Sequence, residues 1–438
     1  MGNYFVIGTT GKEYFGLPDT WEVINNAVLQ LRDVEKSIDQ MVDDAIRHPI
    51  GTSPLAELLQ KKGNILIIVD DIARPTPKKE ILTALVNRLE KFGIKKNQID
   101  ILIATGTHRP LSESEIKALF GETISSELRI TNHDCRSRDL VSVGTLRNGG
   151  EFKIHPLAAR ADFRIAIGSV LPHLFNGYGG GAKVVFPGIA NYEAIRRHHV
   201  SLMVAKGVSL GNMRNNPWHD EICEAGRLAK LDFIINALFN SNEEVREIVA
   251  GHFEKAHESG AEMCAKELGV NFHRAADVTI SSAFPYVEGP QIMKPLCPAT
   301  LVTKKGGYVI LYASDIHGGK FPDPLLEAFD TAFSLADGDP RKLVLDCLRD
   351  GRLIIPDGAI DFNSALNTAL LFLSRVKVIL VSKMIDQKQA ARFGFGYSRS
   401  INEAISQVLR DIPKATVNIL PAGGLVLPLL TKEMIFEW

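Results

Sequence analysis

Residues that can transfer protons, bind anions or attack carbon follow three apolar stretches of the chain. The first stretch ends in "DDIARP" (70–75), the second leads to His108, and the third leads to His173 and then to "GYGGGAK", which ends at Lys183. Carboxylates, imidazoles and a lysine amine serve as general acids, general bases and nucleophiles, and a guanidinium binds carboxylates. The residue types therefore predict a proton-transfer or anion-binding site, provided that the fold brings the three segments together.

The three apolar stretches are predicted strands of one parallel sheet. Residues 64–71, 98–108 and 162–173 are rich in β-branched and apolar residues, as is 232–240, and helical patterns at 77–93 and 112–121 lie between them. Continuous apolar strands that alternate with helices indicate a parallel sheet covered on both faces. Ligands of such sheets bind beyond the carboxyl ends of the strands, which meet at one edge. The chemically active residues are therefore predicted to converge there.

The length of 438 residues predicts two domains. After a predicted helix within 252–275, a second series of strands and helices begins, so we place a boundary near residue 270. The fold class is α/β, with an N-terminal catalytic and cofactor-tethering domain (1–270) and a C-terminal α/β domain (271–438), each built on a mainly parallel sheet flanked by helices. The last strand could return to the first domain. The predicted strands of the second series span 276–285, 306–314, 376–383 and 415–424.

The composition is that of an ordinary soluble protein. The net charge of -1 argues against nucleic acid as the main partner, because phosphate backbones select basic surfaces. Five cysteines without a C-x-x-C pair argue against a disulfide framework or a cysteine-rich zinc site. The N-terminus lacks a signal-peptide pattern, and no apolar run is long enough to span a bilayer. We therefore expect a cytoplasmic protein with no membrane partner.

Each motif alone also has a structural interpretation. A strand-end aspartate such as Asp71 often caps a helix, glycines often supply turns, and a lysine such as Lys183 often extends its amine to water. The glycine-rich segment lacks the frame of a phosphate-binding P-loop, and the chain has no G-x-G-x-x-G dinucleotide motif in the required setting. A glycine-rich backbone can still hold a phosphate through its N–H groups. The convergence of the motifs is more specific than any one of them.

Taken together, the motifs resemble those of the lactate racemase family, whose enzymes use a nickel-pincer nucleotide. The blocks that carry the resemblance are "DDIARP" (70–75), "GTHRP" (106–110), "PHLFNGYGGGAKVVFPGIAN" (172–191) and "EGPQIMKP" (288–295). Their order and spacing match over most of the chain, from about Asp70 to Lys294. The resemblance implies a racemase or epimerase that interconverts the configuration at C2 of a 2-hydroxy acid, at a site in the cleft between the two domains. It also implies that other proteins synthesise the cofactor.

The resemblance further implies roles for the cofactor-binding residues. The cofactor is a pyridinium mononucleotide with sulfur groups that hold nickel, and it is tethered to lysine. Lys183 would be the tether, and His199 would be the nickel ligand in preference to the adjacent His198. Soft sulfur and imidazole donors in a planar arrangement suit nickel(II). The other residues expected to bind the cofactor are Thr105, Gly106, Gly179, Gly180 and Gly181.

The same resemblance implies catalytic roles. His108 and His173 would lie on opposite sides of the α-carbon of the substrate and exchange its hydroxyl proton, which suits imidazole because its pKa lies near neutrality. Arg74 and Lys294 would hold the carboxylate or stabilise a developing oxyanion. The remaining two expected site residues are Asp71, which would orient a partner, and Gln291, which would contact cofactor or substrate.

The chain also departs from the family. Ala182 and Val184 flank Lys183 where relatives often carry arginine and serine, so the resemblance implies the class of 2-hydroxy acids and not lactate itself.

Three other functions remain open from the residues alone. His108, His173 and His199 would suit a zinc-dependent hydrolase, since three imidazoles and a water form a common catalytic zinc site. Lys183 would suit a Schiff-base lyase. The same edge would also suit a non-catalytic protein that binds an anionic nucleotide or sugar acid.

Overall fold

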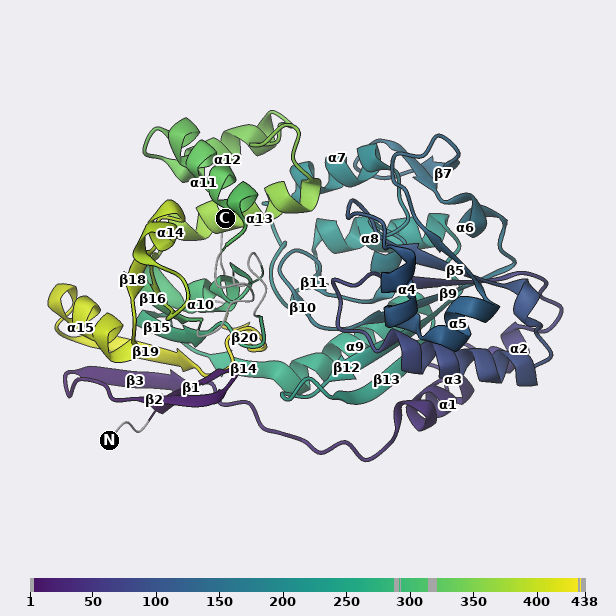
Figure 1. Cartoon of the computed structure of the whole chain (residues 1–438), viewed down its shortest axis with the longest axis horizontal. Helices are drawn as coiled ribbons and strands as arrows, with labels where there is room; N and C mark the ends of the chain where they lie inside the picture. The colour runs from purple at the N-terminus through teal and green to yellow at the C-terminus, as the bar shows by residue number, and fades with distance from the viewer. Residues whose placement is uncertain (1–3, 287–290, 292, 314–320, 432–433, 435–438) are drawn as a thin grey trace. The chain divides into compact units, whose positions relative to one another are not determined.

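The computed structural model describes residues 4–286, 291, 293–313, 321–431 and 434, and it divides the chain into two units (Figure 1). Unit 1 comprises Met1–Gln30, Leu268–Gly358 and Phe362–Trp438, and unit 2 comprises Leu31–Glu267 and Ala359–Asp361. Each unit contains a six-stranded, mainly parallel sheet with helices around it, which confirms the predicted α/β class. The cleft expected between the two units stays a prediction.

The N-terminal segment does not belong to the domain in which we expected it. Strand β3 (Trp21–Asn26) pairs in parallel with β19 (Ala415–Leu420), and the Trp21 indole donates a hydrogen bond to the carbonyl of Ile412 at 3.1 Å. The Trp21 ring is also buried in the apolar cluster beneath this sheet. The expected domain 1–270 is therefore wrong for its first 30 residues, because their pairing partner lies near the other end of the chain.

The strands of unit 1 stay together to the end of the described chain. Strand β19 lies between β15 and β3, and β20 pairs with β14, so the last strands do not return to unit 2. The sheet order is β18 (Gly396–Ser398), β17 (Lys377–Val381), β16 (Thr303–Tyr312), β15 (Ala276–Ser282), β19 and β3. The other elements are β1 (Tyr4–Gly8), β2 (Gly11–Phe15), β14 (Gly269–Phe272), β20 (Leu427–Leu430), α10 (Leu296–Leu301), α11 (Asp323–Ala336), α12 (Pro340–Arg349), α14 (Gln387–Arg392), α15 (Ile401–Asp411) and α13 (Ile360–Leu373), whose first two residues belong to unit 2.

The sheet of unit 2 contains all four strands predicted for the first domain, together with two that were not predicted. Its order is β13 (Val245–Gly251), β12 (Phe233–Phe239), β9 (Phe163–Ser169), β4 (Ile65–Asp70), β5 (Ile99–Ala104) and β6 (Arg129–Asn132). All pairs are parallel except β12 with β13. The missed strands, β6 and β13, lie at the edges of the sheet, where partial exposure interrupts the continuous apolar pattern.

The helices and hairpins of unit 2 cover this sheet. They are α1 (Ile38–Arg47), α2 (Leu55–Leu58), α3 (Lys78–Lys91), η1 (Lys96–Gln98), α4 (Glu113–Phe120), α5 (Glu122–Glu127), β7 (Val141–Thr145), β8 (Glu151–Ile154), α6 (Pro156–Arg160), β10 (Pro172–His173), β11 (Gly177–Tyr178), η2 (Gly181–Val184), α7 (Tyr192–Leu202), α8 (Pro217–Leu228) and α9 (Phe253–Leu268). Helix α4 begins with the predicted capping box, in which Ser112 and Glu115 bond each other's backbone N–H groups.

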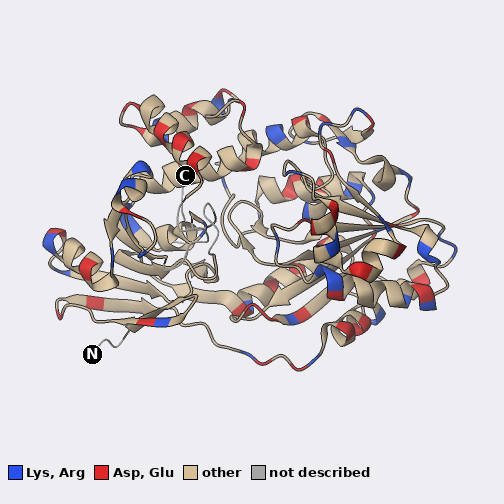
Figure 2. Cartoon of the chain, viewed as in Figure 1, with Lys and Arg blue, Asp and Glu red and all other residues tan. Residues whose placement is uncertain are grey.

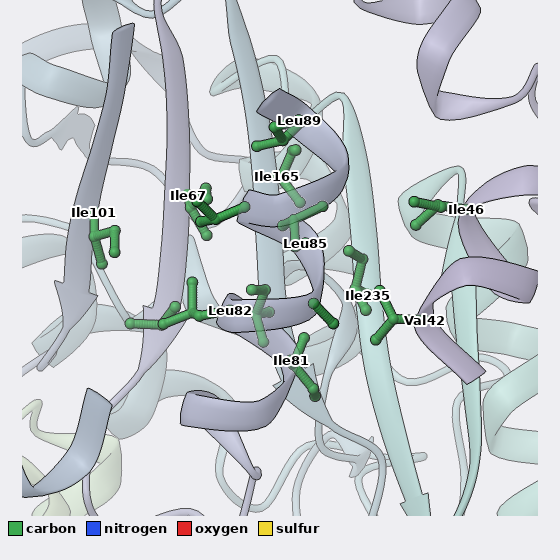
Figure 3. Packing of buried hydrophobic residues seen from close by; sticks show 14 of the residues in the cluster. Val42, Ile46, Ile67, Ile81, Leu82, Leu85, Leu89, Ile101, Ile165 and Ile235 are labelled. Carbon is green, nitrogen blue, oxygen red and sulfur yellow. The ribbon is translucent and has the colours of Figure 1, made fainter. Parts of the chain in front are cut away.

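Helix α3 packs one apolar stripe onto the sheet of unit 2. Figure 3 shows the stripe against strand residues such as Ile67, Ile101 and Ile165, and α1 adds Val42 and Ile46 to the same buried cluster. Spacings of three and four residues place the stripe on one side of the helix. Its members are Ile81, Leu82, Leu85 and Leu89. The other face of the sheet is contacted by the segment that follows β9, since η2 contacts both β4 and β9.

The charged residues lie mainly on the covering layers. In Figure 2, Lys and Arg alternate with Asp and Glu along the helices and loops of unit 2, whereas the central strands are nearly free of colour. Strand β4 is buried at every position, as a strand covered on both faces must be. Across the part of the chain that the structure describes, no helix has both the length and the apolar character needed to cross a membrane.

The packing of α3 gives a first prediction. Leu85 is fully buried against the sheet, so Leu85→Ala should lower the free energy of unfolding by about 2–5 kcal/mol through lost burial and the cavity left behind. Asn87→Ala, at an exposed position of the same helix, is the control and should change it by less than about 0.5 kcal/mol. Urea unfolding followed by circular dichroism measures both, and equal midpoints for the two variants would contradict this packing.

Candidate functional site

Three neighbouring strands of unit 2 deliver the candidate residues to one edge of the sheet. Strands β9, β4 and β5 are adjacent and parallel, so their carboxyl ends lie side by side. The Gly106 N–H, just after β5, donates to the Gly188 carbonyl at 2.9 Å, which joins the loop of His108 to the segment that follows Lys183. Within unit 2, the structure therefore brings the predicted strand ends together.

A buried lysine anchors the loop that carries Asp71 and Arg74. The Lys78 ammonium lies 3.0 Å from the Asp70 carboxylate and donates to the Arg74 carbonyl at 2.9 Å, and its side chain is 0% exposed. Thr76 donates to the other Asp70 oxygen at 2.6 Å. These bonds hold the loop backbone from the buried side. The Arg74 side chain is half-buried, on the outer side of the loop. In the sequence, Lys78 is one residue of the helical pattern at 77–93, and no motif marks its anchoring role.

His108 is held by carboxylates at both ring nitrogens. Its Nδ1 lies 2.5 Å from Asp71, and its Nε2 lies 3.4 Å from Asp361, which belongs to the short second segment of unit 2. Hydrogen bonds with Asp361 and Asp71 raise the pKa of His108 from 6.5 to about 9. Burial is the largest single cause and raises the pKa of Asp71, but the hydrogen bond and charge of His108, the charge of Arg74 and the Ala73 N–H together outweigh it, so the pKa of Asp71 is lowered. His108 is therefore an imidazolium at neutral pH, oriented by Asp71.

His173 contacts Lys183 through one ring nitrogen and the backbone through the other. It ends β10, and its Nδ1 accepts the backbone N–H groups of Phe175 and Asn176 at 3.2 and 3.1 Å. Its Nε2 lies 2.8 Å from the Lys183 Nζ. The tight turn between β10 and β11 creates this arrangement, because it directs two N–H groups back at the side chain that precedes it. Two of the residues predicted to carry chemistry are thus in direct contact.

The glycine-rich segment is packed against the protein's own side chains. The Gly179 N–H donates to the Leu171 carbonyl at 2.7 Å, and the Gly181 N–H donates to Asn236 at 2.8 Å. A Cβ on Gly181, whose φ is +58°, would lie 2.7 Å from the His257 ring. Two of the N–H groups expected to cradle a phosphate are therefore already used, and the glycines serve to place Lys183.

Other members of the expected cofactor set also have structural bonds. The Thr105 hydroxyl donates to the His133 carbonyl at 2.7 Å, within the buried interior. Gly106 has a φ of +56°, and a Cβ there would contact Pro187 at ordinary distance. These two residues position the loop that carries His108.

The adjacent histidines of α7 have different environments. His198 is completely buried, with Nδ1 3.2 Å from the Glu221 carboxylate. His199 is half-buried and donates from Nδ1 to the Ile195 carbonyl at 2.9 Å, which leaves the lone pair on Nε2. Burial lowers the pKa of His199 to about 3, so its ring is neutral. A neutral imidazole with one nitrogen fixed by a carbonyl is the usual form of a metal-ligating histidine, so His199 fits that role.

Gln291 and Lys294 belong to unit 1. The Lys294 ammonium lies 4.6 Å from the centre of the Tyr286 ring, and the Lys294 N–H donates to the Gln291 carbonyl at 2.9 Å. Residues 288–290 and 292 of the "EGPQIMKP" block lie outside the described residues. Their contact with the substrate or cofactor therefore stays a prediction.

Several residues of the candidate site carry no motif in the sequence and were not predicted. His257 donates from Nε2 to the Gly179 carbonyl at 2.7 Å, and His219 bonds the Asn176 side chain at 3.0 Å. Asn236 and Asp361 complete the missed set. No motif marks these residues, because each lies within an ordinary helix or strand and meets the site only through the fold. Polar residues inside the buried strand β12 or on buried helix faces were the one available signal.

The histidines do not form a ready-made metal cluster. Among the residues that the structure describes, no three His, Cys, Asp or Glu side chains are placed to hold one metal ion. His173 already contacts Lys183, and His108 contacts two carboxylates. The zinc-hydrolase alternative, which needs His108, His173 and His199 around one ion, is therefore not favoured.

Comparison with known proteins gives a consistent result. The profile of the lactate racemase N-terminal domain matches residues 10–211. A lactate racemase of Thermoanaerobacterium thermosaccharolyticum is 36% identical over 400 residues, covering 89% of this chain and 90% of the relative. A lactate racemase of Lactiplantibacillus plantarum is 32% identical over 412 residues, covering 91% of each chain.

Solved structures extend the comparison to the fold. The lactate racemase apoprotein of T. thermosaccharolyticum superimposes with a TM-score of 0.85 at 28% identity, covering 97% of this chain and 99% of that one. A protein from Thermotoga maritima has a TM-score of 0.63 at 20% identity, covering 92% of this chain and 100% of that one, which indicates a shared fold.

The buried anchor of the Asp71 loop gives a second prediction. Lys78→Met removes one partner of a buried ion pair and leaves Asp70 uncompensated, so the free energy of unfolding should fall by about 3–5 kcal/mol. Lys79→Met, at the exposed neighbouring position, is the control and should change it by less than about 0.5 kcal/mol. Chemical denaturation measures both, and a fully stable Lys78→Met protein would show that Lys78 does not anchor the loop.

The carboxylates around His108 give a third prediction. Asp71→Asn should lower the pKa of His108 from about 9 toward 6.5, and Asp71→Asn with Asp361→Asn should bring it close to 6.5. Because the folded-state pKa is the higher one, the stabilisation from these contacts is complete below about pH 6.5 and is lost as pH rises through about 9. NMR titration of the histidine ring measures the pKa, with Asp139→Asn as control. A pKa unchanged in the double variant would refute the assignment.

Proposed function

Because the chain belongs to the lactate racemase family, we propose that it interconverts the two configurations at C2 of a 2-hydroxy acid, with a nickel-pincer nucleotide tethered at Lys183. Two relatives that are named lactate racemase match about nine-tenths of the chain, which supports racemase activity. The observation that carries the proposal for this site is the 2.8 Å contact between His173 and Lys183, on a strand end of the same sheet that positions His108. It joins a proton carrier to the expected tether.

The residues present fit the expected cofactor. Lys183 is half-buried on η2, where the packed glycine segment fixes its backbone. His199 offers a neutral imidazole with its lone pair on Nε2, whereas the ring of His198 is enclosed by Phe186 and Trp218. Lys183 would hold the nucleotide and His199 the nickel. When bound, the group would supply a reversible hydride acceptor for the substrate carbon.

The two imidazoles would handle the hydroxyl proton. Removal of that proton makes the C2 hydrogen easier to transfer as hydride, and its return completes the reaction in either direction. His108 is protonated at neutral pH and would donate a proton first, with Asp71 holding its ring in place. His173 is held in its neutral form by backbone N–H groups at Nδ1, so Nε2 is the nitrogen that would exchange a proton with the substrate oxygen. The two imidazoles would therefore start from different protonation states.

Cationic side chains would bind the carboxylate of the substrate. Arg74 extends from the loop that Lys78 anchors, close enough to Asp71 to contribute to its lowered pKa. A guanidinium binds a carboxylate through two parallel hydrogen bonds. We assign this role to Arg74. Lys294 and Gln291, which belong to unit 1, would add supporting contacts.

The fourth prediction tests this assignment with protein produced together with the cofactor-making enzymes. Intact mass should rise by one nucleotide-sized group that maps to Lys183, and Lys183→Ala should abolish the increase. His108→Ala and His173→Ala should each lower the rate of interconversion by about 10²–10⁴. His48→Ala, at an exposed histidine of unit 2, is the control and should retain full activity. The assay follows loss of optical purity across single-enantiomer 2-hydroxy acids.

The result also separates the alternatives. An adduct that forms only after borohydride reduction in the presence of substrate would favour the Schiff-base lyase. Ligand binding without any interconversion, unaffected by His108→Ala, would favour a non-catalytic binding protein. Full activity in Lys183→Ala would contradict the proposed tether.

A further inference from the structure

We propose that His173 holds the side chain of Lys183 as a neutral amine, which makes Lys183 a nucleophile ready to be acylated before any substrate arrives. His173 acts here as a positioning residue, through Lys183. The consequence drawn for cofactor attachment rests on the proposed function, whereas the state of the amine follows from its contact with the His173 ring.

The hydrogen bonds at Nδ1 determine where the proton on the His173 ring lies. Backbone N–H groups of Phe175 and Asn176 both point at Nδ1, so Nδ1 must offer a lone pair. A neutral imidazole has one N–H and one lone pair, and an imidazolium has two N–H groups. In an imidazolium, the N–H at Nδ1 would point at two other N–H donors, which is unfavourable. The ring is therefore neutral, with its proton on Nε2.

The Nε2–H of His173 determines the protonation state of the Lys183 amine that faces it. The Lys183 Nζ lies 2.8 Å from that nitrogen, at hydrogen-bond distance. A lysine ammonium has three donors and no acceptor, so it cannot receive the Nε2 proton. A neutral amine keeps a lone pair and can. The contact is therefore an Nε2–H donated to a neutral Lys183.

The surroundings of Lys183 favour the same state. The amine lies among buried imidazoles whose pKa values are lowered by burial, which leaves those rings uncharged. Desolvation of this kind disfavours an ammonium. These imidazoles are His198, His199, His219 and His257, and a positive charge on Lys183 would lower their pKa values further. The glycine segment keeps the amine there, because Asn236 and His257 bond its backbone on either side of Gly180.

A neutral amine suits the attachment of a carboxyl-derived group. Its nitrogen forms a bond to the acyl carbon, the bond from that carbon to the leaving group breaks, and the amine proton departs with the leaving group. The nitrogen of the amide-type product no longer accepts a hydrogen bond. Attachment would therefore release the His173 Nε2–H for the oxygen of a substrate, so that one histidine serves two successive steps.

Competitive acetylation of the full-length protein, produced without cofactor-making enzymes, tests the inference. Trace acetic anhydride at pH 7 transfers its acetyl group to the amine nitrogen, with release of acetate and a proton, and peptide mass spectrometry measures each lysine. An ordinary lysine is unprotonated in only about one molecule in 10³ at this pH. Lys183 should therefore react at least about tenfold faster than the exposed Lys79 and Lys206. An equal or slower rate would overturn the inference without any variant.

A matched pair of variants tests the part played by His173. In His173→Asn, the side-chain oxygen can still accept the two backbone N–H groups, but the side chain is too short to reach Lys183. Acetylation of Lys183 should fall about tenfold. A purely structural role predicts the opposite, because a loosened segment would expose the amine. His155→Asn is the control, since the Nδ1 of His155 accepts the Leu157 N–H in the same manner, away from Lys183. An unchanged rate in His173→Asn would overturn the inference.

The two proposals fail separately. Acetylation needs neither cofactor nor substrate. If Lys183 reacts fast but the protein produced with the cofactor-making enzymes shows no racemase activity, the proposed function alone is refuted. A slow-reacting Lys183 in an active racemase would refute the neutral amine alone.

Discussion

Two backbone N–H groups aimed at one ring nitrogen of His173 determine the state of that ring and of the Lys183 amine that faces it. They fix the ring as the Nε2–H tautomer, that tautomer faces Lys183 with a donor, and a donor needs a lone pair on the amine. The short turn between β10 and β11 supplies the N–H groups, so a local feature of the backbone controls the chemistry of a side chain ten residues further along the chain.

The parallel sheet of unit 2 supplies the second constraint. Adjacent strands β9, β4 and β5 release their loops at one edge, and internal bonds hold each loop: Lys78 under the first, Thr105 under the second, and the packed glycine segment after the third. Such preorganisation matters because proton carriers act only within hydrogen-bond reach of the group they serve. His108 and His173 are consequently held in opposite protonation states by fixed neighbours, carboxylates in one case and N–H groups in the other.

Much of this arrangement is predictable from the sequence, for a physical reason. Strands buried on both faces must be continuously apolar, so 64–71 and 162–173 are visible, and the capping box at Ser112 marks a helix start. Pairing between segments that are far apart in the sequence cannot be predicted from local patterns. No residue near Trp21 indicates that its strand pairs with β19. The same holds for His257 and Asp361, whose contacts exist only after folding. The glycines show both what can be predicted and what cannot. Their clustering predicts a special loop, but the hydrogen bonds of that loop do not follow from the clustering.

The tautomer of His173 is the most direct test of this account. Long-range ¹⁵N–¹H NMR spectra of histidine-labelled protein distinguish a protonated ring nitrogen from one that carries a lone pair, and His173→Asn assigns the signal. We expect a neutral ring with the proton on Nε2 and an unprotonated Nδ1 at neutral pH. A proton on Nδ1, alone or together with one on Nε2, would contradict the account, because the ring would then meet the backbone donors with a donor of its own.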